Sequence, residues 1–171
     1  MSKAIGISKV EYGTVGDGVP AIAFTEIAEA FVEESVVFGF GEPSDTKIPQ
    51  ETKDTAYHTI TTKEDPDYIE FKLLTPAAAT LVTLMGGSAT GEKWEEPPAI
   101  PEINLTIKIT TKTVGGYYYE YTIVNGKVVG RLDGAPSKKK AETVNIRVYK
   151  EAAITAAGAE NTPFTRERVA A

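Results

Sequence analysis

A helix signal within a chain of strand-like segments constrains this sequence most. The run Thr75–Gly87 carries both a start and a stop for a helix. Thr75 can cap the free amides of a first turn, and Pro76 suits the first helical position because it has no amide to satisfy. Gly86 can take the left-handed conformation that ends helices. The sequence therefore predicts one short helix, at about residues 75–86.

The apolar residues of this helix share one face, because Leu81, Leu84 and Met85 are spaced i, i+3, i+4. One short helix cannot bury such a stripe alone, so we expect it to lie on a β-sheet. Alternating residues predict the strands, and Gly115-Gly116 and Asn125-Gly126 are typical hairpin turns between them. The expected strands of the C-terminal half, the last with Val144, Ile146 and Val148 inward, are 102–110, 117–124, 127–132 and 143–149.

The N-terminal half is less regular. Ala21–Glu34 has a spacing that fits a helix face, but we read most of it as strand, followed by the β-prone Ser35–Phe40. The polar segment Gly39–Asp54 predicts a long loop or a protruding hairpin, and loops of that length are often functional. Two further segments are expected to pair as strands across a short turn: Tyr57–Thr62 and Tyr68–Leu74.

These patterns predict a mainly β fold, an antiparallel β-sandwich or split barrel with one short flanking helix. The length of 171 residues and the hydrophobic fraction of 42% fit one β domain at 1–152, with a loosely ordered C-terminal extension at 153–171. The sequence contains no cysteine, which excludes a disulfide framework and favours synthesis in a reducing cytoplasm. Neither a membrane-spanning run nor a signal peptide is expected.

Charge is distributed unevenly. Residues 1–70 hold 14 acidic residues against 5 lysines, a net charge of −9, whereas residues 71–171 hold 13 basic against 10 acidic residues, a net of +3. This asymmetry fits either an ordinary solvated surface or opposite surfaces that meet between copies of the chain. A net charge of −6 makes a poor DNA binder, and we expect Lys138–Lys140, the only basic cluster, to be a solvated turn.

Catalytic and metal-binding patterns are weak. His58 is the only histidine and lies in an expected strand, and without cysteine a Cys/His pair is impossible. The glycine-rich run Gly86–Lys93 lacks a P-loop's residues at its lysine and magnesium positions and follows a helix. Asp65-Pro66-Asp67 and the group Glu92, Glu95 and Glu96 offer carboxylates that could hold a weak calcium ion, but their spacing matches no EF-hand loop, and Pro66 favours a tight turn. We therefore expect no enzyme, no cofactor and no metal.

The order of these elements resembles a known family. A strand, a short helix closed by Leu84-Met85-Gly86-Gly87, a connection with Trp94 and prolines, and strands that end in Val144–Tyr149 are similar to the major tail (tail tube) proteins of long-tailed bacteriophages, which are related to the inner-tube proteins of contractile injection systems. The resemblance covers about residues 20–152 and depends on order and spacing.

The resemblance implies a structural virion protein without catalytic residues. Its subunits would form hexameric rings, stacked into a tail tube through which DNA passes without binding, with other tail proteins as partners and no membrane. Synthesis and assembly would take place in the host cytoplasm, and the product would lie in the virion tail. The family's long hairpin loop contacts neighbouring subunits, and the matching residues here are Glu42, Pro43, Asp45, Lys47, Pro49, Glu51, Lys53 and Asp54.

A binding module is the alternative function. Tyr117, Tyr119 and Tyr121 share one face of a strand, and a carbohydrate-binding or adhesin-like β-sandwich would expose such rings to solvent. The other interpretation of these tyrosines is a sheet face covered by the helix.

Overall fold

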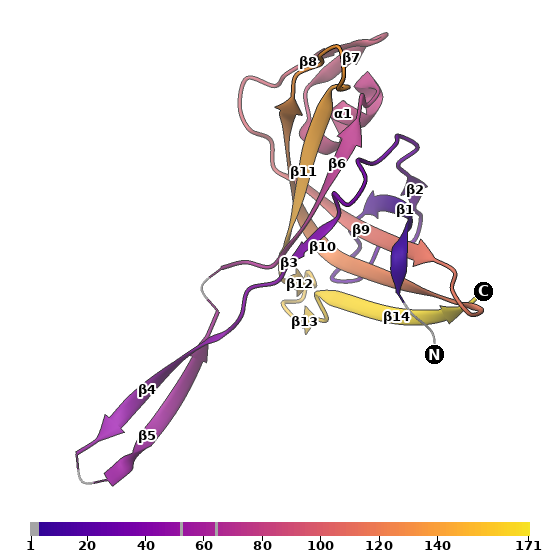
Figure 1. Ribbon diagram of the computed structural model, residues 1–171. Coiled ribbons are helices and arrows are strands. Elements are labelled where there is room, and N and C mark those ends of the chain that lie inside the picture. The colour runs from indigo at the N-terminus through magenta and orange to yellow at the C-terminus, as the bar shows by residue number, and fades with distance from the viewer. Residues whose placement is uncertain (1–3, 52, 64) are drawn as a thin grey trace.

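The computed structural model describes residues 4–51, 53–63 and 65–171, and it has a mainly β fold with one short helix (Figure 1). An antiparallel sheet in the order β2-β1-β9-β10-β11-β6-β3 dominates it, with β14 also paired to β10. The sheet does not close into a barrel, since β2 and β3 are its ends. Its strands are β1 (Ile5–Thr14), β2 (Thr25–Glu26), β3 (Val37–Gly39), β6 (Tyr68–Leu74), β9 (Ile103–Lys112), β10 (Tyr117–Gly134), β11 (Thr143–Lys150) and β14 (Phe164–Ala170).

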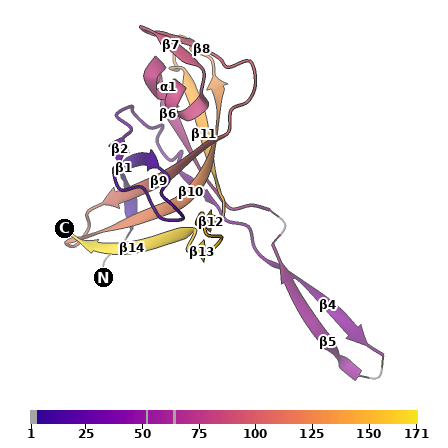
Figure 2. The ribbon, with the colours of Figure 1, turned by 180° about the vertical axis from the view of Figure 1, so that it is seen from behind.

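One hydrophobic core unites the two halves of this sheet. The steeply inclined strands β6 and β11 cross the direction of β9 and β14 (Figures 1 and 2). The side chains predicted to point inward from β11 are all fully buried, as are Ile107 and Ile109 of β9. The core also contains Val10 of β1 and Phe71 of β6, which the sequence did not assign.

Strand β10 is the longest of the sheet and changes partners along its length. Residues Tyr117–Ile123 pair with β14, and Gly126–Gly134 pair with β11. The prediction of a hairpin turn at Asn125-Gly126 was therefore wrong. A register shift against β9 marks this place, where a Cβ on Gly126 would lie 2.4 Å from Cγ1 of Val148. Glycine at position 126 thus lets β11 lie close to β10, while β10 continues through this position without a turn.

The other predicted turn is confirmed. Gly115 and Gly116, with φ of 65° and 79°, are the two central residues of a tight turn between Val114 and Tyr117, within the connection that joins β9 to β10. The amide of Val114 donates to the carbonyl of Tyr117 at 2.8 Å across this turn. Positive φ at both central residues is what such a tight hairpin needs, and glycine supplies it without strain.

The helix α1 (Ala78–Met85) starts later than predicted. Its N-cap is Ala77, which makes no side-chain cap, and Thr75 has a left-handed φ of 43° instead of capping the helix. A residue distant in sequence replaces the missing cap: the Glu29 carboxylate accepts hydrogen bonds from the Ala77 amide, at 3.3 Å, and from the Thr80 hydroxyl. A carboxylate at a helix N-terminus is favoured by the helix dipole.

The end and the apolar face of α1 are as predicted. Gly86 has φ of 75° and ends the helix, Leu84 is 1% exposed, and Leu81 and Met85 pack against the core. A hairpin of β7 (Ser88–Thr90) and β8 (Lys93–Glu95) follows the helix. It is tied back by the Trp94 indole, which donates to the Gly86 carbonyl at 2.8 Å.

The segment Ala21–Glu34 is largely irregular, so the prediction of a strand was wrong except at β2. Its backbone groups bond to neighbouring strands one at a time: Ile27 donates to Val10 at 2.9 Å and Leu74 donates to Ala30 at 2.8 Å. Its apolar side chains fill the end of the core, where Phe31 packs edge-on against Phe71 at 5.8 Å. The spacing of these apolar residues therefore reflects packing and not a regular element.

The C-terminal segment was predicted to be loosely ordered, and the structure contradicts this. It forms β12 (Ala153–Ile154), β13 (Glu160–Asn161) and β14, and β14 pairs with β10 over seven residues. The reason lies in β10: its first half would otherwise present an unpaired edge and bare aromatic rings. Ordered contacts with that edge compensate the entropy of fixing the segment.

Candidate functional site: the projecting β4–β5 arm

A two-stranded hairpin, here called the arm, projects far from the rest of the molecule (Figures 1 and 2). It consists of β4 (Ser44–Gln50) and β5 (Lys53–Thr62), which pair with each other in a separate sheet. This confirms a protruding hairpin, but the hairpin spans Ser44–Thr62 and not the predicted Gly39–Asp54. The predicted pairing of Tyr57–Thr62 with Tyr68–Leu74 was wrong, because β5 pairs with β4 and β6 pairs with β11 and β3.

The two faces of the arm differ in polarity. Because cross-strand partners share a face, the pairs Thr46–Ile60 and Ile48–His58 place two isoleucines and the only histidine together. Ile48 and Ile60 are 41% and 42% exposed. We call Thr46, Ile48, His58 and Ile60 the apolar face of the arm.

The opposite face is polar, with the pairs Lys47–Thr59 and Asp45–Thr61, and the Thr61 hydroxyl donates to the Asp45 carboxylate at 2.6 Å. An isolated two-stranded hairpin is only marginally stable in water. An arm with one apolar face therefore gains stability when another surface covers that face.

All eight residues predicted to contact a neighbouring subunit lie on this arm or at its entry. Glu42 and Pro43 lead into β4, Glu51 lies at the tip, and Lys53 and Asp54 begin β5, where their side chains lie outside the described part. Their contact with another subunit stays a prediction. The sequence does not indicate that Ile48, His58 and Ile60 share a face, because it predicts a different partner for β5. The available signal is weak: Ile48 lies between Lys47 and Pro49, and Ile60 lies between Thr59 and Thr61. The three residues that β4 contributes to the predicted set are Asp45, Lys47 and Pro49.

A buried carboxylate lies at the base of the arm. The Asp67 side chain is 3% exposed and forms ion pairs with Lys63 and Lys150. Burial raises the pKa of the Asp67 carboxyl, but the hydrogen bonds and charges of Lys150 and Lys63 outweigh burial and hold the pKa below its usual value. Asp67 is therefore an anion near neutral pH and belongs to a charge network, not to the calcium site considered for Asp65–Asp67.

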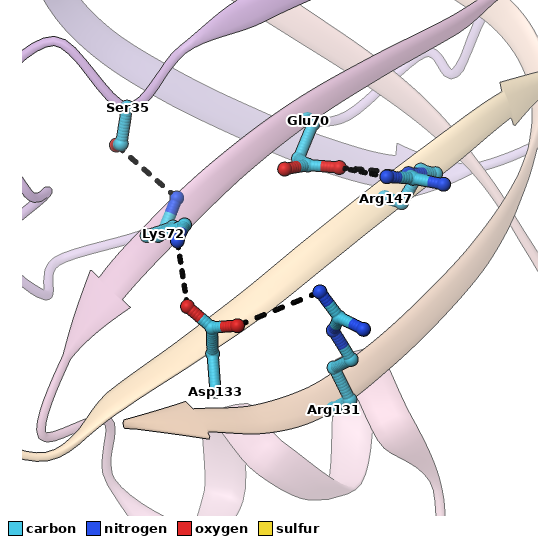
Figure 3. A network of polar contacts seen from close by, with 6 residues as sticks. All are labelled: Ser35, Glu70, Lys72, Arg131, Asp133 and Arg147. Carbon is cyan, nitrogen blue, oxygen red and sulfur yellow. Dashed lines mark hydrogen bonds and ion pairs between the residues drawn. The ribbon is translucent and has the colours of Figure 1, made fainter. Parts of the chain in front are cut away.

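The outer face of β10, β11 and β6 carries paired charges (Figure 3). The Arg147 guanidinium donates to the Glu70 carboxylate at 2.7 Å, and Asp133 pairs with Lys72 at 2.6 Å and with Arg131 at 3.5 Å. The backbone amide of Lys72 donates to the Ser35 hydroxyl at 3.2 Å.

The pKa values of the two carboxyls on this face follow from their partners. Burial raises the pKa of Glu70, but Arg147 and Asn145 hold it below its usual value, and Lys72 lowers the pKa of Asp133. Both carboxylates are thus engaged by cations, an arrangement that stabilises a sheet face and supplies no poised acid or base.

The predicted tyrosine face is covered in part, by β14 and not by the helix: Tyr119 is 7% exposed, whereas Tyr117 is 37% exposed. The Arg166 guanidinium of β14 lies over the ring of Tyr119 at 4.4 Å, and that of Arg168 lies over Tyr117 at 4.7 Å. Phe164 stacks on Tyr121 with ring centres 6.5 Å apart. Cation–π contacts and stacking occupy these rings. These contacts leave less ring surface free for a sugar than an open aromatic platform would offer.

The remaining candidate residues lie in structural positions. Lys138–Lys140 belong to an exposed turn in which the Ser137 amide donates to the Lys140 carbonyl at 2.8 Å. Gly86–Lys93 ends α1 and forms β7 with the turn of the β7–β8 hairpin, in which Glu95 pairs with Lys93. In the part of the chain that the structure describes, no three histidine or acidic side chains gather closely enough to hold a metal ion. Among the same residues, no helix is both long and apolar enough to cross a membrane.

A scan against models of known protein families and a search of curated protein sequences both gave no match for this chain.

Proposed function

We propose that this protein is the building subunit of a bacteriophage tail tube. In this proposal copies of the chain close into hexameric rings, the rings stack, and DNA passes through the channel without being bound. The partners are other copies of the chain and further tail proteins, the protein is not an enzyme, and its final location is the virion tail after assembly in the host cytoplasm.

The arm is the observation that carries this proposal. It has an apolar face that the molecule itself leaves exposed, and its cost in exposed apolar surface is offset if a neighbouring copy covers Ile48 and Ile60. An arm of this kind reaches beyond the body of one subunit, which suits a protein whose neighbours are copies of itself (Figure 2).

Three other features support the same function. The open antiparallel sheet with one flanking helix agrees with the fold that the tail-tube resemblance implies. Among the strands that the structure describes, β14 pairs with β10 along one edge, which leaves its other edge free. A free edge is a surface to which a strand of another copy can pair. The net charge of −6 suits a channel that repels phosphates.

Electron microscopy of the purified full-length protein tests the proposal. Negatively stained samples over a range of concentrations should show rings or tubes with a central channel, and sedimentation velocity should show the matching oligomers. Replacing Ser44–Thr62 by a short Gly-Ser turn should leave the fold intact, as judged by circular dichroism and thermal unfolding, and abolish these assemblies. A protein that stays monomeric at every concentration would refute the proposal.

Point variants locate the contact on the arm. The double variant Ile48→Ser with Ile60→Ser removes the apolar face and should prevent or strongly weaken assembly. The matched control is Thr59→Ser with Thr61→Ser, which changes two residues of the polar face of the same hairpin and keeps their hydroxyls. Equal assembly of both variants would remove the apolar face from the mechanism.

A further inference from the structure

Asp67 lies where both connections of the arm meet the body of the molecule. Its carboxylate accepts a hydrogen bond from the Gly41 amide at 3.2 Å and forms ion pairs with Lys63 and Lys150. Its backbone carbonyl accepts a second bond from Lys150, whose amide lies 2.7 Å away. The carboxylate of one buried residue thus holds three separate segments of the chain.

These three segments are the two legs of the arm and the main sheet. Gly41 belongs to the leg that enters β4, and Lys63 directly follows the last residue of β5. Lys150 is the last residue of β11, and its ammonium also lies over the Phe40 ring at 5.4 Å, next to Gly41. Figure 1 shows both legs leaving the body at this end of β3 and β6. We call Gly41, Lys63, Asp67 and Lys150 the arm clamp.

Beyond this clamp the described side chains of β4 and β5 bond within the arm. Ser44 bonds to Thr62, and Thr61 bonds to Asp45. The direction of the arm is therefore decided at its base. A hairpin on two unfastened legs samples many directions, and a subunit must then lose that freedom at every contact it makes.

We propose that Asp67 is the positioning residue that fixes the direction of the arm relative to the main sheet. By holding both legs to β11, it presents the apolar face of the arm in one orientation, so that docking to a neighbouring subunit costs less conformational entropy. This second consequence rests on the proposed function, whereas the fixed direction of the arm does not.

A merely stabilising role for Asp67 makes a different prediction. If the ion pairs only contribute to the stability of the body, removing them lowers the free energy of unfolding and leaves the arm's direction unchanged in the folded protein. If they position the arm, the folded variant shows a spread of arm directions. A distance between arm and body, measured in the full-length monomer, separates the two roles.

The absence of cysteine makes such a measurement direct, because two introduced cysteines are the only labelling sites. Thr59→Cys on the arm and Glu167→Cys on β14 place spin labels at exposed positions of the two parts. Pulsed electron paramagnetic resonance, at a concentration where sedimentation shows a monomer, should give one narrow distance distribution for the parent. Asp67→Asn should at least double its width.

Glu70→Gln is the matched control. It removes one negative charge from an ion pair on β6, in the same part of the sheet, that touches neither leg of the arm. Its distance distribution should equal that of the parent. Should Asp67→Asn fail to fold, Lys63→Met carries the test, because Lys63 is 38% exposed and anchors only the β5 leg. Parent-like widths in Lys63→Met and in any folded Asp67→Asn would overturn the proposal.

Assembly provides the second readout. At equal concentration, Asp67→Asn should assemble about tenfold more slowly than the parent, while Glu70→Gln should match the parent. A parent protein that never assembles would refute the tube function, and the distance distributions would still decide whether Asp67 positions the arm.

Discussion

Gly130 of β10 lies directly beneath Met85 of the helix: a Cβ built on Gly130 would lie 2.4 Å from the Met85 Cγ. The same Cβ would lie 2.9 Å from Cδ1 of Ile146. A side chain at position 130 would therefore push α1 away from the sheet. Glycine here sets the distance between the helix and the strands that it covers.

Gly130→Val should destabilise the protein by about 1 to 3 kcal/mol, the usual cost of overpacking a core. Urea unfolding followed by circular dichroism measures this. Val129→Ala is the control, because Val129 is 39% exposed and lies on the opposite face of β10, and it should change stability by less than about 0.5 kcal/mol. Adding Met85→Ala to Gly130→Val should recover part of the loss, and strictly additive costs would show that Met85 is not the obstacle.

Strand β14 should be essential for stability even though it ends the chain. A protein truncated after Asn161 loses the strand that pairs with Tyr117–Ile123 and uncovers Tyr119, which is 7% exposed in the intact molecule. We expect this truncated protein to aggregate or to unfold at least 10 °C below the full chain. The truncation should lower the free energy of unfolding by several kcal/mol, and each kcal/mol shifts the unfolding midpoint by about 2 to 4 °C. Differential scanning calorimetry measures the change.

Single substitutions in β14 distinguish packing from mere chain length. Phe164→Ala removes a ring that contacts Phe40 at 5.1 Å and Tyr121, and should cost about 1 to 3 kcal/mol because the ring is partly exposed. Glu167→Ala changes an exposed residue of the same strand and should have little effect. A truncated protein as stable as the full chain would restore the idea of a loose tail.

Local signals in the sequence predicted the elements that depend on nearby residues. The backbone freedom of glycine predicted the Gly115-Gly116 turn and the end of α1 at Gly86. A period of two in the apolar residues predicted which side chains of β11 point inward. Neighbouring residues in the sequence decide all three features. The prediction of the helix start was wrong because the cap comes from Glu29, which is far from Thr75 in the sequence.

Distant pairing explains the other failures. Asn125-Gly126 has the composition of a hairpin turn, yet partners from both β11 and β14 keep β10 continuous there. The C-terminal segment resembles a tail in composition because five of its last eight residues are charged or small, but the edge and rings of β10 give it a place to pair. For the arm, the predicted contact residues lie on the hairpin or at its entry and their contact with a subunit stays a prediction, whereas its apolar face depended on knowing that β4 pairs with β5.

Acid should weaken the fold through Asp67 and Glu70. Their cationic partners, Lys150 and Lys63 for Asp67 and Arg147 for Glu70, hold the pKa of each carboxyl below its ordinary value against the opposing effect of burial. The unfolded chain then binds more protons than the folded one, so the contribution of these groups is complete above about pH 5 and is lost as the pH falls below about 4. Each group can change the free energy of unfolding by at most about 1.4 kcal/mol per pH unit.

Urea unfolding at pH 7, 5 and 3.5 tests this dependence. The parent should lose stability mainly between the last two values, and Asp67→Asn or Glu70→Gln should lower stability at pH 7 while making the acid loss smaller. Asp17→Asn is a control, since Asp17 is exposed and, among the residues that the structure describes, its carboxylate accepts only a hydrogen bond from the Ala156 amide. An acid loss of the same size in the parent and in both variants would exclude these two carboxyls as its cause.

Charge should govern assembly and leave DNA unbound. The chain has a net charge of −6, Arg166 and Arg168 lie over tyrosine rings, and Lys138–Lys140 form one small turn, so few phosphates can be neutralised. Fluorescence anisotropy with a labelled duplex at about 50 mM salt should show no binding up to about 10 μM protein, whereas a basic DNA-binding protein would bind more tightly at such low salt.

Assembly should slow near 1 M salt, where the Debye length is about 3 Å, if the acidic N-terminal and basic C-terminal portions attract one another between subunits. An assembly rate that does not depend on salt would reject this attraction, and tight, salt-sensitive binding of the duplex would reject a passive channel.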